Sequence, residues 1–279
     1  MPESPKIALT GASGFVGTHL KRRFPDHVII AREDSTERII KRLDGVDVVI
    51  NLAGAPIIHR WTDSYKRLLF SSRIETTKKL VSAINQSDVS LFISTSATGI
   101  YPDGVECDES CTNLSDDFLG TLAKEWERQA QRCNKKTAIL RFGVVLGKEG
   151  GALKKMLLPF RLGLGGPIGN GQMLISWIDI EDLLRIYELV IEKGLEGIIN
   201  AVSPKPVTNK EFTKALSRVL RRPALFPVPV FVLHLLYGQA ATVLTASKIV
   251  FPKRLEEEGF TFRYGEIEAS LRHILSKQQ

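Results

Sequence analysis

Short apolar runs alternate with longer amphipathic stretches along most of the chain. Each apolar run has the length and the continuous hydrophobic character of a buried strand. The runs occupy residues 6–10, 27–31, 46–52, 89–95, 136–146 and 198–202. Helical spacing of apolar residues lies between them, at residues 35–43, 64–86 and 118–133. Strands that alternate with helices predict an α/β fold built on a Rossmann-type, doubly wound parallel sheet.

The opening of the chain carries three regularly spaced glycines. Residues 6–20 read K-I-A-L-T-G-A-S-G-F-V-G-T-H-L, which predicts a strand, a tight turn and a helix start. Gly11 permits the turn, Gly14 lets the backbone approach a pyrophosphate, and Gly17 lets the helix pack closely on the sheet. The free N–H groups and the positive end of the helix dipole would face the phosphates.

Glycine triplets also occur in ordinary loops, so the context of this turn matters. A second apolar run follows one helix length later and closes a βαβ unit, which favours a dinucleotide site. The cofactor contacts predicted in this turn are Gly11, Ser13, Gly14, Phe15, Val16 and Gly17.

The end of the second strand predicts which cofactor binds. In such folds an acidic residue about 20 positions past the first glycine binds the ribose 2′-hydroxyl, whereas an arginine accommodates a 2′-phosphate. Here Ala31 is followed by Arg32, which favours NADP(H) over NAD(H). Two alternatives stay open, because Arg32 could be a solvated charge and Glu33 or Asp34 could bind a ribose.

Small residues follow the third strand directly. Leu52, Ala53 and Gly54 are expected to line the cofactor at the carboxyl end of the sheet, although Gly54 could be a plain turn glycine. Arg73, on the next helix, is a further candidate. It could reach a phosphate or pair with a carboxylate on its own helix.

Hydroxyl groups gather where the strand at residues 89–95 ends, in the sequence S-T-S-A-T at residues 94–98. Hydroxyls at this position can polarise a substrate carbonyl, and they can also cap loops and turns. Ser96 is the candidate for the catalytic role.

The second half of the chain contains more closely spaced glycines. Glycines at residues 150–171 predict a flexible loop region, and residues 172–202 return to a strand–helix–strand pattern. We expect a domain at residues 1–150 that binds NADP, with residues 172–202 returning to it. Residues 151–171 and 203–279 would form a small, mostly helical lobe over the active-site cleft. The apolar stretch at residues 226–237 is too short to span a bilayer and is expected to be a core or lobe helix.

Two helix starts are predicted from capping residues. Asp179 or Asp182 is expected to cap the helix that follows residue 179. Thr208 and Glu211 have the spacing of a capping box.

Composition narrows the possible partners. The 279 residues carry a formal charge of +7, which suits an anionic ligand, but the basic residues are dispersed and nucleic-acid binding is not expected. Three cysteines without metal-site spacing predict reduced thiols, no metal and a cytoplasmic protein. No secretory leader and no membrane partner are expected.

The motifs together resemble the extended short-chain dehydrogenase/reductase superfamily. The resemblance rests on T-G-A-S-G-F-V-G at residues 10–17, N-L-A-G at 51–54, S-T-S-A-T-G-I-Y at 94–101, L-R-F-G-V-V-L-G at 140–147 and W-I-D-I-E-D at 177–182. Residues 60–77, 156–171 and 252–264 are similar to an atypical "epimerase-family" branch that ends in a small domain of unknown function. The resemblance implies NADP(H) near Arg32, Leu52, Ala53 and Arg73. Arg141, in the fourth motif, is added to the predicted contacts, and a homodimer through two long helices is possible.

One departure from the superfamily concerns catalysis. Its usual Tyr-x-x-x-Lys pair, in which the lysine lowers the pKa of the tyrosine, is missing from the helix at residues 118–133. Phe118 or Leu119 stands in place of the tyrosine, residue 122 or 123 stands in place of the lysine, and Lys124 is out of register.

Two hypotheses follow. The first is an oxidoreductase that transfers hydride between NADP(H) and an unknown carbonyl, alcohol or nucleotide-sugar-like substrate, with Ser96 orienting the oxygen and Lys124 or water moving the proton. The second is a non-catalytic NADP(H)-binding protein that reports the redox state of the cofactor.

Overall fold

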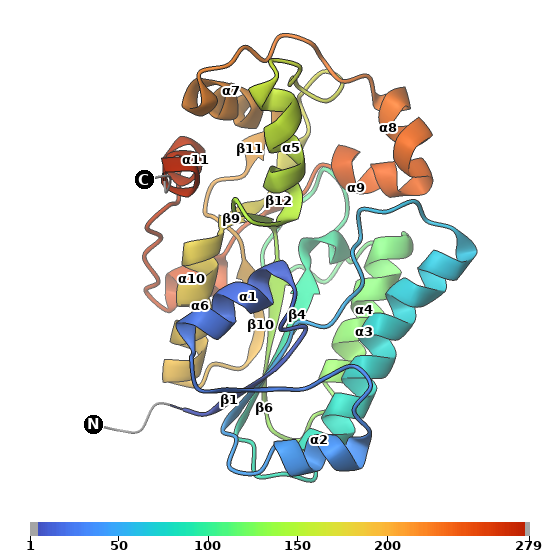
Figure 1. Ribbon diagram of the computed structural model, residues 1–279, viewed down its shortest axis with the longest axis vertical. Coiled ribbons are helices and arrows are strands. Elements are labelled where there is room, and N and C mark those ends of the chain that lie inside the picture. Colours follow the sequence, from blue (N-terminus) through green and yellow to red (C-terminus); the bar gives the residue numbers. More distant parts are fainter. Residues whose placement is uncertain (1–4, 277–279) are drawn as a thin grey trace.

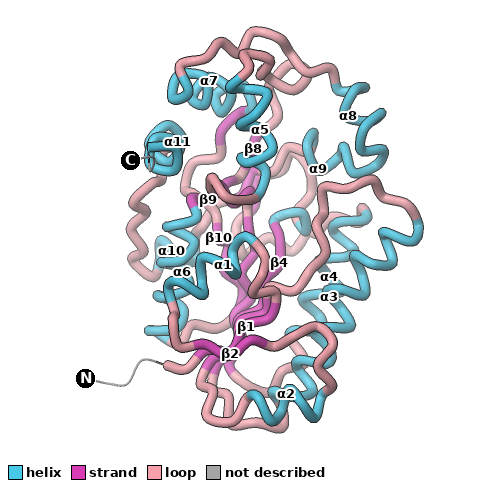
Figure 2. The backbone as a smooth tube through the Cα atoms, viewed as in Figure 1, coloured by secondary structure: helices cyan, strands magenta, loops and turns pink. Residues whose placement is uncertain are grey.

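The computed structural model describes residues 5–276 and is built around a sheet of six parallel strands (Figures 1 and 2). Across the sheet the order is β2 (His27–Ile29), β1 (Ile7–Thr10), β3 (Val48–Asn51), β4 (Leu91–Ala97), β6 (Lys136–Phe142) and β10 (Gly197–Ala201). The predicted α/β fold with a doubly wound parallel sheet is confirmed.

Helices cover both faces of the sheet (Figure 1). One face carries α1 (Phe15–Arg23), α6 (Ile180–Lys193) and α10 (Lys253–Glu257). The other carries α2 (Thr36–Arg42), α3 (Asp63–Ile84) and α4 (Phe118–Ala130). The two long helices α3 and α4 pack side by side.

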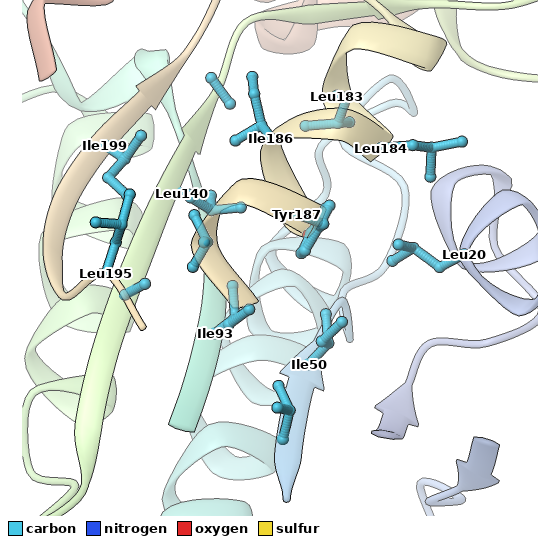
Figure 3. Packing of buried hydrophobic residues seen from close by; sticks show 14 of the residues in the cluster. Leu20, Ile50, Ile93, Leu140, Leu183, Leu184, Ile186, Tyr187, Leu195 and Ile199 are labelled. Carbon is cyan, nitrogen blue, oxygen red and sulfur yellow. The ribbon is translucent and has the colours of Figure 1, made fainter. Parts of the chain in front are cut away.

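Each face has its own hydrophobic core because the strand residues alternate in direction. On the first face, Leu20 of α1 and Leu183 and Tyr187 of α6 pack against Ile50 and other strand residues, all of them fully buried (Figure 3). On the second face, the core combines residues of α2 and α3 with the opposite sides of the same strands.

The strand order places a crossing point between β1 and β3. β1 pairs with β2 through Ile7 and His27, and on its other side with β3 through Ile7 and Val48. From β1 the chain passes to β2 at one edge of the sheet. It then returns to the other side of β1, where β3 and the later strands follow one another. Sheets of this kind bind ligands outside the carboxyl ends of the strands at such a point.

The run predicted as one strand at residues 136–146 is broken at Gly143. β6 ends at Phe142, and β7 (Val144–Leu146) pairs instead with β9 (Trp177–Asp179). A Cβ atom at Gly143 would lie 2.6 Å from the carbonyl oxygen of Ser176, so only glycine fits where the chain changes sheets.

The prediction of a loop region throughout residues 150–171 is wrong. Residues 151–161 form α5 (Gly151–Arg161), which buries Leu153, Leu157 and Phe160 at helical spacing. These side chains join α7 (Asn209–Leu220) and α11 (Ile267–Ser276) in a third core around Trp177. One short strand pair, β8 (Leu174–Ile175) with β11 (Val207–Thr208), borders this core. A second pair, β5 (Glu106–Cys107) with β12 (Ile249–Val250), belongs to a separate small cluster of buried residues.

Both predicted helix caps are confirmed. Asp179 accepts a hydrogen bond of 2.8 Å from the N–H of Glu181. Thr208 and Glu211 form a complete capping box at the start of α7.

The remaining elements are short. They are η1 (Thr98–Ile100), α8 (Val230–Tyr237), η2 (Gly238–Ala241) and α9 (Thr242–Thr245). Over residues 5–276 no helix has both the length and the apolar character that a membrane span requires.

Candidate dinucleotide site

The glycine turn leads directly from β1 into α1. Gly11 has a φ of +65°, and its carbonyl accepts a hydrogen bond of 3.0 Å from the N–H of Gly14. Gly14 is the N-cap of α1, and no side chain caps the helix there. The N–H groups of the first helical turn are therefore available to an anion.

The three glycines have different neighbours. A Cβ atom at Gly11 would lie 2.7 Å from the carbonyl oxygen of Leu52, and one at Gly17 would collide with the Gly11 carbonyl. At Gly14 an added Cβ would meet the Gly11 carbonyl oxygen at 3.2 Å, and both Ser13 and Gly14 are exposed. Gly11 and Gly17 are needed for packing, whereas Gly14 presents open backbone.

The first residues of α1 contact the chain that enters the third core. The ring of Phe15 fills the space that a Cβ atom would occupy at Gly147 and Gly150. Val16, its neighbour, is half-buried against the first core. This packing fixes the direction in which α1 begins.

A buried hydrogen-bond network, which the sequence did not lead us to expect, holds the loop after β3. Thr10 donates to Asn51 Oδ1 at 2.8 Å, and the N–H of Leu52 donates to Thr10 Oγ1 at 3.1 Å. Asn51 Nδ2 donates to Thr77 at 2.8 Å, and Trp126 Nε1 donates to the same hydroxyl at 3.0 Å. The sequence did carry a signal for this network, because β1 and β3 each end in a polar residue, Thr10 and Asn51. The network places Leu52 and the residues after it beside the glycine turn.

Arg73 lies beneath this loop and is only 8% exposed. Its guanidinium donates to the carbonyl of Ala55 at 2.9 Å and stacks over Trp126, 5.2 Å from the ring centroid. Burial lowers the pKa of Arg73 to about 10, so it is charged at neutral pH. No salt bridge to a carboxylate of residues 5–276 is formed, so the alternative of an ion pair is not realised. A Cβ atom at Gly54 would lie 2.8 Å from the guanidinium carbon, so this glycine makes room for Arg73.

The three charged residues after β2 differ in their surroundings. Asp34 is buried, accepts the N–H of Ala31 at 2.8 Å and pairs with Arg42 at 3.0 Å. Its carboxylate is therefore occupied. Arg32 and Glu33 are exposed, and Lys79 of α3 holds their segment through the carbonyl oxygen of Arg32 at 2.8 Å.

Ser96 and Arg141 belong to a buried network around Glu127 of α4. Ser96 donates to Glu127 at 2.6 Å, and Arg141 binds both carboxylate oxygens at 2.8 and 2.7 Å. Arg141 also donates to the hydroxyl of Tyr101 at 2.7 Å, and Tyr101 donates to Asn200 at 2.9 Å. Burial alone would lower the pKa of Arg141, but its hydrogen bonds with Glu127 raise it. Burial raises the pKa of Tyr101 to about 12 against the influence of Arg141.

These contacts bear on two of the predicted roles. The hydroxyl of Ser96, 1% exposed, is committed to Glu127, so it does not fit the role of orienting a substrate oxygen. Arg141, 2% exposed, neutralises the same carboxylate and does not fit the role of a cofactor contact. Both side chains join β4 and β6 to α4.

Lys124 does not fit the predicted role in proton transfer either. It points to the surface and pairs with Asp116 at 2.6 Å.

Of the two residues that could replace the superfamily tyrosine, Phe118 packs on Trp61 with ring centroids 4.8 Å apart. Leu119 faces Gly99 and borders a cavity of ≈ 430 Å³ between residues 102–119 and α9.

The structure thus brings together the glycine turn and the loop at residues 52–54, with Arg73 behind that loop. It leaves Ser96, Arg141 and Lys124 outside this group. Within residues 5–276, no set of three or more His, Cys, Asp or Glu side chains is grouped as a metal site would require.

Comparison with known sequences agrees with this geometry. Residues 7–201 match the NAD dependent epimerase/dehydratase family, and residues 228–274 match a domain of unknown function, DUF1731. The Arabidopsis thaliana protein named epimerase family protein SDR39U1 homolog, chloroplastic, is 36% identical, over 96% of this chain and 86% of that protein. Epimerase family protein YfhF of Bacillus subtilis is 34% identical over 98% of this chain and 99% of its own length.

Solved structures are similar over the same span. Human epimerase family protein SDR39U1, crystallised with NADPH, has a TM-score of 0.89 and 32% identity, covering 98% of this chain and 99% of that one. A nucleoside-diphosphate sugar epimerase from Corynebacterium glutamicum has a TM-score of 0.79 and 30% identity, covering 98% of this chain and 58% of that one. UDP-glucose 4-epimerase from Thermotoga maritima shares the fold at 16% identity, with a TM-score of 0.76, over 97% of each chain.

Proposed function

Because the chain belongs to the NAD dependent epimerase/dehydratase family, we propose that it binds NADP(H) at the carboxyl ends of β1 and β3 and acts as an oxidoreductase. The observation that carries the proposal is the start of α1, where Gly14 leaves the first helical N–H groups without a side-chain cap beside the loop after β3. Backbone N–H groups so placed bind phosphates. The human relative that was crystallised with NADPH supports the same choice of cofactor.

The environment of Arg32 supports the phosphorylated form of the cofactor. Its side chain is exposed at the end of β2, while the carboxylate of Asp34 is already bound by Ala31 and Arg42. A guanidinium can bind a 2′-phosphate through charge-assisted hydrogen bonds.

Arg32→Ala tests this assignment. We expect NADPH affinity to fall about 10- to 100-fold, the loss typical of a hydrogen bond to a charged group, while NADH affinity changes little. Arg22→Ala, an exposed arginine on α1, is the matched control. Equal losses for the two cofactors in calorimetric titrations would refute the 2′-phosphate contact.

In the proposed reaction, NADPH when bound supplies a hydride to a carbonyl carbon. This chain contributes the positioning of the cofactor, and the proton is supplied by water, because Lys124 is paired with Asp116 and Ser96 with Glu127. The absence of a positioned acid typically slows such a step about 100- to 10,000-fold. The cavity beside Leu119, which Ser115, Asp117, Thr242 and Lys248 also line, suits a substrate with several hydroxyl groups.

A panel of small aldehydes, ketones and sugar nucleotides, followed by NADPH absorbance, tests the reaction. We expect slow turnover with at least one hydroxylated carbonyl compound and no loss of turnover in Lys124→Gln. NADPH binding without turnover across the panel favours the second candidate, a non-catalytic NADP(H) sensor. The specific observation behind that candidate is that both predicted catalytic side chains are engaged elsewhere.

A further inference from the structure

The most exposed large apolar side chains gather at one end of the molecule. They lie near the end of α5 and in the segment that leads into and forms α8, and each is 59% to 76% exposed. These side chains are Leu158, Leu162, Leu164, Leu225, Phe226, Phe231, Leu235 and Leu236. We call residues 158–164 and 225–236 the apical surface. Exposed apolar patches of this kind mark interaction sites.

The two segments of the apical surface are neighbours in space. Ile168 forms a β-bridge with Val228, and the N–H of Val228 donates to the carbonyl of Pro167 at 2.8 Å. The turn glycine Gly166 packs on the backbone of Phe226. In Figure 1 the loop between α7 and α8 runs along the end of the molecule farthest from α2.

The helix α8 has no partner on most of its surface. Its sequence is V-F-V-L-H-L-L-Y, and within it Leu233 alone is buried. Its main neighbour is the adjoining η2. Phe231 and Leu235, one turn apart, are 70% and 72% exposed on the same face. A helix that is apolar all round is normally covered by protein or lipid.

The two segments of the apical surface, with the residues that flank them in sequence, carry only positive charge. The sequence contains no Asp or Glu at residues 150–178 or 212–255. Arg161 closes α5, and Arg221 and Arg222 precede the apolar loop. Within residues 5–276 none of these three arginines forms a salt bridge, whereas Arg218 pairs with Glu268.

We propose that the apical surface docks on an anionic phospholipid membrane. The apolar side chains would enter the interface between headgroups and acyl chains, and the three arginines would bind lipid phosphates. A symmetric contact with a second copy would bring these unpaired arginines together, and neither segment of the apical surface carries a carboxylate to offset their charge. The expectation of no membrane partner came from the absence of a spanning stretch, which peripheral docking does not require.

Flotation of the full-length protein with lipid vesicles tests this proposal. We expect binding to phosphatidylcholine vesicles that contain phosphatidylserine, little binding to phosphatidylcholine alone, and release by salt. Arg161→Gln and Arg222→Gln should each lower partitioning about fivefold. The double variant Phe231→Ser/Leu235→Ser should abolish it.

Matched controls are available elsewhere on the surface. Val105→Ser and Arg22→Gln change an exposed apolar and an exposed basic residue outside the apical surface, and both should bind vesicles like the unaltered protein. A thermal melt of each variant verifies folding. No binding to phosphatidylserine vesicles, or equal losses in the controls, would overturn the proposal. A dimer that Phe231→Ser/Leu235→Ser dissociates, without vesicle binding, would assign the surface to a second copy.

Discussion

At the scale of single residues, the ion pair between Glu127 and Arg141 is the most consequential contact outside the dinucleotide site. Their side chains are 6% and 3% exposed. Ser96 donates a hydrogen bond to Glu127, and Arg141 donates one to the hydroxyl of Tyr101. Removing one charge of a buried pair leaves the other uncompensated in a medium that solvates it poorly.

Glu127→Gln is therefore expected to lower the free energy of unfolding by about 3 kcal/mol. Glu125→Gln, which breaks the exposed pair with Arg128, should lower it by less than about 1 kcal/mol. Urea unfolding followed by circular dichroism measures both. Equal values for the two variants would show that the buried network contributes no special stability.

The residue scale also shows what could be inferred from sequence. The glycine turn and Arg32 are local features, readable from a strand, three glycines and the next strand. The role of Ser96 was not readable, because its partner Glu127 lies 31 positions away on another element. Hydroxyls look alike in a sequence whether they face a ligand or a buried carboxylate.

At the scale of elements, the glycines between β1 and α1 have different tasks: Gly17 serves packing, and Gly14 is expected to serve cofactor binding. Gly17→Ala would push a methyl group against the Gly11 carbonyl, whereas Gly14→Ala would add one to exposed backbone with a normal φ of −72°. The two substitutions should therefore have different effects.

We expect Gly17→Ala to lower the free energy of unfolding by about 1–3 kcal/mol. Gly14→Ala should leave stability nearly unchanged but weaken NADPH binding roughly tenfold, because the added methyl group stands where the pyrophosphate approaches. Gly99→Ala, whose Cβ would have its nearest contact at 3.5 Å, is the control for both measurements. If Gly14→Ala binds NADPH normally, the phosphate site is misplaced.

Helices and strands were predicted well where the apolar residues keep a single helical or strand spacing. They were predicted poorly where glycines interrupt that spacing. The helix α5 was missed because glycines flank it and Pro159 lies inside it, although its apolar residues 153, 157 and 160 keep helical spacing. The break at Gly143 was missed because the residues before and after this glycine are equally apolar. Only the strand with which the chain pairs changes there, and the sequence does not show that.

At the scale of the whole molecule, the cores share their elements. β6 of the main sheet continues through Gly143 into β7, which lies on the third core, and β9 leads back into α6 over the sheet. Ligand binding at the dinucleotide site should therefore stabilise the whole chain in one transition.

We expect NADPH at about 100 times its dissociation constant to add about 2.7 kcal/mol to the free energy of unfolding. For a chain of this size the midpoint of thermal unfolding should rise by roughly 5 °C. The same concentration of NADH should raise it less. Two separate transitions, with only one shifted by NADPH, would contradict the shared-core arrangement.

The return of the chain to its first core sets a limit on dissection of this protein. A fragment that ends at residue 150 would retain five of the parallel strands but lack α6 and β10, and Ile50, Ile93 and Leu140 would face water. Such a fragment would be prone to aggregate. An autonomous nucleotide-binding unit would have to be spliced from two separate stretches of the gene.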